Sequence, residues 1–200
     1  MVKIVFIILS VVLFSGCVMT TTPPMNEYRV NADLSFSALS EGKCNKKSLK
    51  VAQAFSANSL KSLKMKYAQG ENKLFSYSQS QWALSPNQAI TSEVMTLLKD
   101  LELFSSVQIA KSVSRNDMLL EINIDEFMQY FSEDAKSSYV KVIISFTLLD
   151  THSKKIVATK TFREKNSVAL LNADGGVKAL NASLRNILLQ SSIWFEGVCR

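Results

Sequence analysis

The chain has 200 residues with a formal net charge of +6, and 47% of its residues are hydrophobic and 20% charged. That length is enough for one domain with a real core and too short for two domains of ordinary size. A modest basic excess suits the surface of anionic phospholipids, but the lysines are scattered and lack the interleaved aromatic residues of a nucleic-acid site. We therefore expect no nucleic-acid partner, and the pattern favours a solvated surface.

Residues 1–16 have the features of a secretory signal peptide. They contain one charge, Lys3, and then an apolar run over 4–14 that is too short to span a roughly 30 Å hydrocarbon core as a helix. The small residues before Cys17 resemble the bacterial lipobox, in which the cysteine receives acyl chains such as palmitate and becomes the mature N-terminus. We therefore expect Cys17 to anchor the mature chain to a membrane. A signal peptide with a chance cysteine, or an uncleaved anchor, would be the alternative.

The mature chain is expected to start with a lipidated tether over residues 17–26 and to continue as a domain over 27–200. The tether contains three threonines followed by two prolines, a composition typical of an extended linker. Fully stretched, its nine residues after Cys17 reach about 30 Å. From Tyr28 to Ala38 apolar and polar residues alternate strictly, which predicts a half-buried strand.

Two cysteines, Cys44 and Cys199, remain if Cys17 carries lipid. Export permits disulfides, and an even pair in an oxidising compartment is most simply a bridge. Two free thiols too far apart to meet would be the alternative. A zinc site is excluded, because His152 is the single histidine and neither cysteine has a neighbour at ligand spacing.

The next segment predicts three strands. Ser48–Phe55 reads as one strand, and apolar residues alternate with polar ones in Leu63–Tyr67 and again in Phe75–Tyr77. The link between these two runs contains Gly70 and Asn72, which tolerate a positive φ. We therefore expect the two runs to form a β-hairpin.

A helix follows this hairpin. Ser85 is followed by a proline and, three positions after Ser85, by Gln88. This pattern is typical of a capping box. Apolar residues at helical spacing predict an amphipathic helix over Pro86–Leu101, and residues 106–109 predict a short strand after it. Trp82, just before the helix, is expected to be a core aromatic residue, with a role in partner binding as the alternative.

The strongest β pattern lies between residues 118 and 162. Residues 118–131 alternate, with a change of inward parity near Glu126 that indicates a β-bulge. Rows of apolar residues over 140–148 and 156–162 follow, each after a polar turn. These three runs predict an antiparallel meander.

An amphipathic helix of about twenty residues is expected from Val177 onward, after Asp174, Gly175 and Gly176. Asp174 is expected to cap it, with an anion site at the exposed amides as the alternative. The predicted fold class is therefore α+β, with a mostly antiparallel sheet and two amphipathic helices packed on it.

Several segments together carry a family resemblance: Trp82–Pro86, Leu101–Val107, Ser138–Val140 with Thr147–Asp150, Ile156–Phe162 and Gly175–Val177. In this order and spacing, the chain resembles the ABC-type transport auxiliary lipoproteins, the PqiC-like family. The resemblance covers most of the mature domain. The long first strand and the pair Cys44 and Cys199 are not part of it.

The resemblance implies a periplasmic lipoprotein that works with an ABC transporter and an MCE-domain protein to move lipids between two membranes. It implies no cofactor and no catalysis, and a lone His152 in a polar turn cannot supply a catalytic triad. Contact with phospholipid and assembly into homo-oligomers are further expectations. Val18 follows Cys17 where Asp would favour inner-membrane retention, which favours an outer-membrane anchor.

Two other classes of function stay open. A structural envelope-assembly lipoprotein would share the anchor and the layering, and a small-ligand or hydrolytic enzyme would need a site that the sequence does not display. An adaptor needs an interaction surface instead, and the apolar connection containing Val168, Leu170 and Leu171 is the candidate. Burial of this connection under the last helix is the competing interpretation.

Overall fold

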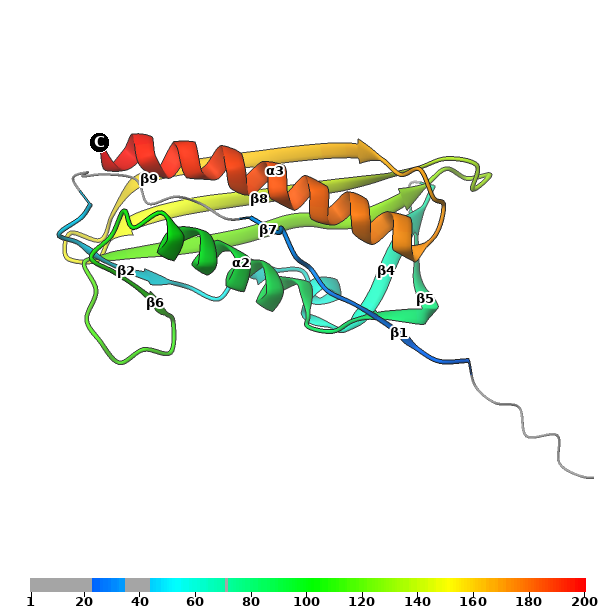
Figure 1. Cartoon of the computed structure of the whole chain (residues 1–200), viewed down its shortest axis with the longest axis horizontal. Helices are drawn as coiled ribbons and strands as arrows, with labels where there is room; N and C mark the ends of the chain where they lie inside the picture. The colour runs from blue at the N-terminus through cyan, green and yellow to red at the C-terminus, as the bar shows by residue number, and fades with distance from the viewer. Residues whose placement is uncertain (1–22, 35–43, 71) are drawn as a thin grey trace, which may run out of the picture.

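The computed structural model describes residues 23–34, 44–70 and 72–200, so Cys17, the signal peptide and most of the tether lie outside the described residues. The described ranges contain nine strands, two α-helices and one 3-10 helix (Figure 1). The strands are β1 (Asn26–Tyr28), β2 (Ser48–Val51), β3 (Phe55–Ser56), β4 (Lys64–Gln69), β5 (Lys73–Trp82), β6 (Ser106–Ile109), β7 (Met118–Phe131), β8 (Ser138–Asp150) and β9 (Lys155–Ser167). The helices are η1 (Asn58–Lys61), α2 (Pro86–Asp100) and α3 (Ala173–Cys199). This content confirms the predicted α+β class.

The strands form one mixed sheet built around β7, so the expectation of a mostly antiparallel sheet was wrong. One edge of β7 pairs antiparallel with β8, and β8 pairs antiparallel with β9, which is the predicted meander. The other edge of β7 pairs in parallel with β2, β3 and β4. Strand β6 pairs in parallel with β2, and β1 with β5. Parallel neighbours are joined by long connections, which leave no local pattern in the sequence.

The predicted bulge lies in β7, where the register with β8 shifts between Ile124 and Glu126. Before the shift Ile122 and Ile124 are buried, and after it Phe127 and Gln129 are buried. An extra residue in one strand of an antiparallel pair produces this change of parity. The bulge therefore keeps an apolar row facing the same side along the whole length of β7.

Both helices cover the same face of the sheet (Figure 1). Helix α2 follows the prediction to within one residue, and its apolar stripe, including Val94 and Leu98, is fully buried. Helix α3 packs on β8 and β9, with Phe195 buried against Phe146 at a centroid distance of 5.6 Å. Each large apolar side chain buried in this layer contributes on the order of 1.5–3 kcal/mol. One continuous core thus lies between the sheet and the helices.

The predicted first strand over 28–38 is mostly not a strand. Strand β1 ends at Tyr28, and the chain then leaves the sheet; residues 35–38 lie outside the described part. Val30 and Ala32 are buried, as the alternation predicted, but their backbone is held by helix side chains. The Ala32 N–H donates to Glu93 of α2 over 3.0 Å, and Asn181 of α3 donates to the carbonyl of Arg29 over 3.1 Å. The segment therefore fills the space between two helices.

The second predicted strand, Ser48–Phe55, is interrupted. It forms β2 and the two-residue β3, and both pair with β7. Between them the Ala54 N–H donates to the Thr91 hydroxyl of α2 over 3.0 Å. The predicted hairpin of β4 and β5 is confirmed.

The capping expectations were wrong in detail for both helices. Ser85 is the residue before α2, but its hydroxyl donates to the Gln88 side chain over 2.9 Å and makes no side-chain bond to a backbone N–H. Helix α3 begins at Ala173, four residues earlier than predicted, and its cap is Asn172, whose Oδ1 accepts from the Gly175 N–H over 2.9 Å. Asp174 instead forms an ion pair with Lys178 at 2.8 Å.

The two glycines at the start of α3 allow close packing. A Cβ on Gly175 would lie 2.1 Å from the Leu170 carbonyl oxygen, and a Cβ on Gly176 would lie 1.9 Å from Oε1 of Gln129. Only glycine fits at such distances. This contact, and not an open anion site, explains the paired glycines.

Gly176→Ala is therefore expected to lower the free energy of unfolding by roughly 1–3 kcal/mol, because the added methyl group displaces the buried Gln129 side chain. Gly197→Ala near the end of α3 is the matched control, since a Cβ there meets nothing within 4 Å. It should leave stability unchanged or raise it by up to about 1 kcal/mol. Urea unfolding measures both, and wild-type stability of Gly176→Ala would contradict the packing described.

Candidate functional site

Ser48, Asp117 and His152 meet at one end of β7. Oδ2 of Asp117 accepts from the Ser48 backbone N–H at 2.8 Å and from its hydroxyl at 2.7 Å, while Oδ1 lies 3.4 Å from Nε2 of His152. The hydrogen bond from the Ser48 backbone, then that from its hydroxyl, then that from His152, lower the pKa of Asp117 to about 2. In a catalytic triad the histidine stands between serine and aspartate. Here the aspartate stands in the middle, so the group joins the starts of β2 and β7.

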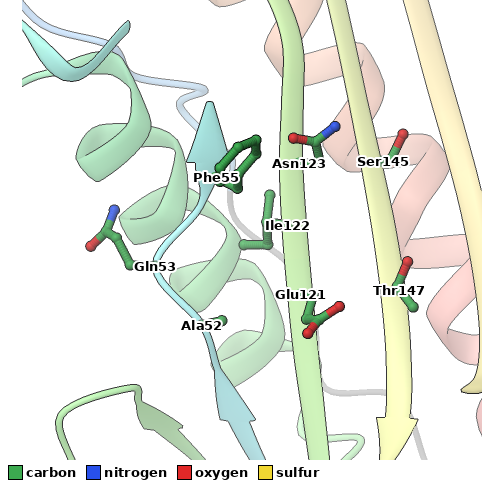
Figure 2. Close-up of a pocket in the computed structure, with 8 residues that line it drawn as sticks. All are labelled: Ala52, Gln53, Phe55, Glu121, Ile122, Asn123, Ser145 and Thr147. Atoms are coloured by element: carbon green, nitrogen blue, oxygen red, sulfur yellow. The ribbon is translucent and has the colours of Figure 1, made fainter. Parts of the chain in front are cut away.

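A hollow of about 340 Å³ lies on the face of the sheet away from the helices (Figure 2). Glu121 of β7 and Thr147 of β8 contribute to its floor, and Phe55, with a relative exposure of 70%, lies beside Asn123. The hydroxyls of Thr147 and Thr159 bond to each other at 2.9 Å. No histidine, cysteine or lysine is among the residues that line this hollow.

The connection between β9 and α3 presents apolar side chains to solvent. Val168 is buried, and its N–H donates to the Ser138 carbonyl over 2.9 Å. Leu170 and Leu171 have relative exposures of 53% and 43%. The Asn172 N–H donates to the Leu170 carbonyl over 2.8 Å, and Gly175 packs on the same carbonyl. The connection is thus held at both ends while two leucines remain exposed.

An aromatic cluster lies near the start of α3, on the face of the sheet that the helices cover. The ring of Tyr67 lies 5.5 Å from Phe75, 4.6 Å from Tyr77 and 5.3 Å from Phe131, centroid to centroid. Phe75 is exposed. We call Leu170, Leu171 and this cluster the apolar end. The leucines were predicted from the sequence, but the cluster was not, although pairing Tyr67 with Phe75 in the predicted hairpin would have indicated it.

Gln129 joins the aromatic cluster to the first turn of α3. Its Oε1 accepts from the Tyr77 hydroxyl over 2.9 Å, its Nε2 donates to the Ser138 hydroxyl over 2.9 Å, and Gly176 packs on it. Burial first, and then the neighbouring Tyr67, raise the pKa of Tyr77 above its usual range, so its hydroxyl stays protonated and can donate. A buried amide whose oxygen and nitrogen are both hydrogen-bonded holds the apolar end in one arrangement.

The two cysteines meet at the opposite end of the molecule. A disulfide joins Cys44, in the turn before β2, to Cys199 at the end of α3, with a Cα–Cα distance of 5.1 Å.

Trp82 lies in the core, where its ring packs 5.9 Å from that of Phe127. Trp82 is therefore a core residue, as expected, and not an exposed contact.

Across residues 23–34, 44–70 and 72–200, no helix is long and apolar enough to cross a membrane. Within the same ranges, no group of three or more His, Cys, Asp or Glu side chains is placed to hold a metal ion.

Comparisons with known proteins agree on the fold. A family model described as "ABC-type transport auxiliary lipoprotein component" matches residues 37–190. A crystal structure of a protein from Xanthomonas campestris has a TM-score of 0.74 at 15% identity and covers 86% of this chain and 96% of that one. The crystal structure of an uncharacterized protein has a TM-score of 0.63 at 13% identity, covering 86% and 99% respectively. At these identities the two structures show the fold alone. No curated protein matches the chain.

Replacing both Cys44 and Cys199 with Ala should lower the free energy of unfolding by about 3–5 kcal/mol, because the bridge closes a loop of 155 residues in the unfolded chain. Reductant should destabilise the wild type by a similar amount and leave the double variant unaffected. Alkylation of the unreduced, unfolded protein should modify neither thiol. Free alkylation of both would show that the bridge does not form in the cell.

Proposed function

This chain belongs to the ABC-type transport auxiliary lipoprotein component family, and on that premise we propose that it is a non-enzymatic adaptor of an MCE-type lipid transport system. The family supports a lipoprotein role associated with transport. The proposal adds an MCE-domain protein and ABC transporter subunits as partners, which the sequence resemblance implies. ATP would then be hydrolysed by a partner subunit.

The observation that carries the adaptor role is the exposure of Leu170 and Leu171 on a connection that is fixed at both ends. Exposed apolar side chains held in one arrangement suit a protein interface, because association then costs little ordering. Phe75, the exposed member of the aromatic cluster, adds an apolar side chain at the same end of the molecule. Protein interfaces are typically rich in such aromatic side chains.

We place the protein in the periplasm, anchored to the outer membrane by acyl chains on Cys17 and separated from it by the tether. Val18 supports outer-membrane sorting, since Asp in that position would favour retention at the inner membrane. Several copies assembled side by side would present several apolar ends to one partner. A structural envelope-assembly lipoprotein is the second candidate, and it shares the anchor and the interface but not the partners.

Replacing both Leu170 and Leu171 with Asp should remove most of the crosslinking between this protein and the MCE-domain partner, because two charges would be buried in an apolar interface. The matched control is Leu189→Asp with Ile193→Asp, an exposed apolar pair in the second half of α3, with relative exposures of 42% and 71%. Crosslinking in cells, followed by mass spectrometry, measures the effect.

The control pair should crosslink like the wild type, and both variants should unfold at the wild-type urea concentration. Equal crosslinking by the Leu170/Leu171 variant and the wild type would remove this connection from the interface. Unfolding of that variant would show that the two leucines stabilise the domain instead.

Cys17→Ala should prevent acylation and leave an uncleaved precursor, because the lipoprotein peptidase recognises the lipid-modified cysteine. The variant should migrate more slowly on a gel and should not incorporate labelled palmitate. Cys44→Ala serves as the control and should be acylated normally. Wild-type processing and palmitate labelling of Cys17→Ala would refute the lipid anchor.

A further inference from the structure

The side chains on the face of the sheet away from the helices change from acidic to basic and aromatic along its length. Around the hollow of Figure 2 it carries the acidic side chain of Glu121, and Asp125 lies next to the hollow, where its carboxylate accepts from the Ser145 hydroxyl over 3.4 Å. Towards the turn between β7 and β8, the strand register aligns residues of the same face in rows. One row pairs Met128 with Lys141 and Lys141 with Lys165. The next row pairs Glu126 with Ile143 and Ile143 with Arg163.

A third row, closer to the turn, is apolar and aromatic. It pairs Leu74 with Ala68, Ala68 with Tyr130, and Tyr130 with Tyr139. The rings of Tyr130 and Tyr139 stack at 5.1 Å, and Nζ of Lys165 lies 4.1 Å from the centroid of the Tyr139 ring. A hollow of about 390 Å³ adjoins both tyrosines. Leu74, Tyr130, Tyr139, Lys141, Arg163 and Lys165 together form what we call the basic aromatic patch.

The charge of this patch is positive. Glu126 is the acidic residue in its rows; burial first, and then the neighbouring Glu126, raise the pKa of the Tyr130 hydroxyl above its usual range. The turn beyond the patch carries Asp134, which is paired with Lys136 at 3.7 Å, and Glu133, which packs beside Gly70. Arg163 and Lys165 are exposed and Lys141 is half-buried, and the three cations have one acidic neighbour in their rows. Lysine and arginine combined with tyrosine are typical of surfaces that lie at the headgroup level of a membrane.

The chain also enters the domain at this end. Figure 1 shows residues 23–25 approaching β1 from the end where α3 starts and where β7 turns into β8. If Cys17 carries lipid, as the proposed function holds, eight residues separate it from Asn26. Fully extended, they reach only about 27 Å. The anchor therefore holds this end, and not the disulfide end, near the bilayer.

We propose that the basic aromatic patch binds the anionic phospholipid headgroups of the membrane that holds the anchor. The lysines and Arg163 attract phosphate groups, and the tyrosines and Leu74 occupy the interfacial layer. The apolar end lies on the opposite face of the same strands, since successive residues such as Tyr67 and Ala68 point to opposite faces. It stays available to a protein partner while the patch faces lipid.

Binding of vesicles by the mature chain with Cys17→Ser tests the proposal without an anchor or a partner. The protein should sediment with vesicles of phosphatidylethanolamine and phosphatidylglycerol, not with phosphatidylcholine vesicles, and salt should weaken the binding. Lys141→Gln, Arg163→Gln and Lys165→Gln combined should lower the partition coefficient about fivefold for each cation, on the order of a hundredfold in total.

Lys99→Gln, Lys111→Gln and Lys155→Gln combined form the control, because they remove the same charge from exposed positions outside the patch. The partition coefficient of this control should fall only a few-fold. The variant with Lys141→Arg and Lys165→Arg should bind vesicles like the wild type. An equal loss in both Gln triples would refute a specific patch, as would no binding by the wild type. Normal vesicle binding by the patch triple together with loss of a protein partner would assign the patch to an acidic protein instead.

Discussion

Strand β7 is the centre of the sheet, because it is paired along both edges. Its backbone is satisfied by β8 on one side, while β2, β3 and β4 each satisfy part of the other side. A buried strand with unpaired N–H and C=O groups would be costly, so these short parallel strands complete the central strand. The hollow of Figure 2 lies where this second side is interrupted, between β2 and β3. Both proposed surfaces lie at the other end, where β7 meets β4.

The sequence predicts well the elements whose pattern is local. The alternation of β7 and β8, the bulge near Glu126 and the stripe of α2 each depend on residues a few positions apart, and all three are present. The alternation from Tyr28 onward predicts the burial of Val30 and Ala32 correctly but not the partner, because helix side chains and a neighbouring strand can both satisfy an extended backbone. The parallel pairings left no local pattern.

The candidate site was predictable from the sequence only where its pattern is local. An apolar connection at Leu170 and Leu171 is visible in the sequence, whereas its exposure depends on how Val168 and Gly175 fix the chain. The basic aromatic patch was not predicted, because its cations come from two strands and meet only through the register of β8 with β9. Scattered lysines in a sequence can therefore gather on one face of a sheet.

The two ends of the molecule have different roles. One end holds the disulfide and the end of α3, which close the domain. At the other end residues 23–25 lead into β1 (Figure 1), and this end carries the apolar end and the basic aromatic patch on opposite faces of the sheet. This arrangement suits a protein that stays close to a membrane and holds a partner there.

The most direct test of the adaptor role is purification of the lipidated wild-type protein from membranes in mild detergent, with mass spectrometry of everything that accompanies it. An adaptor should be recovered with an MCE-domain protein and with subunits of an ABC transporter. Recovery of only outer-membrane or peptidoglycan-associated proteins would refute the adaptor role and favour a structural role in the envelope.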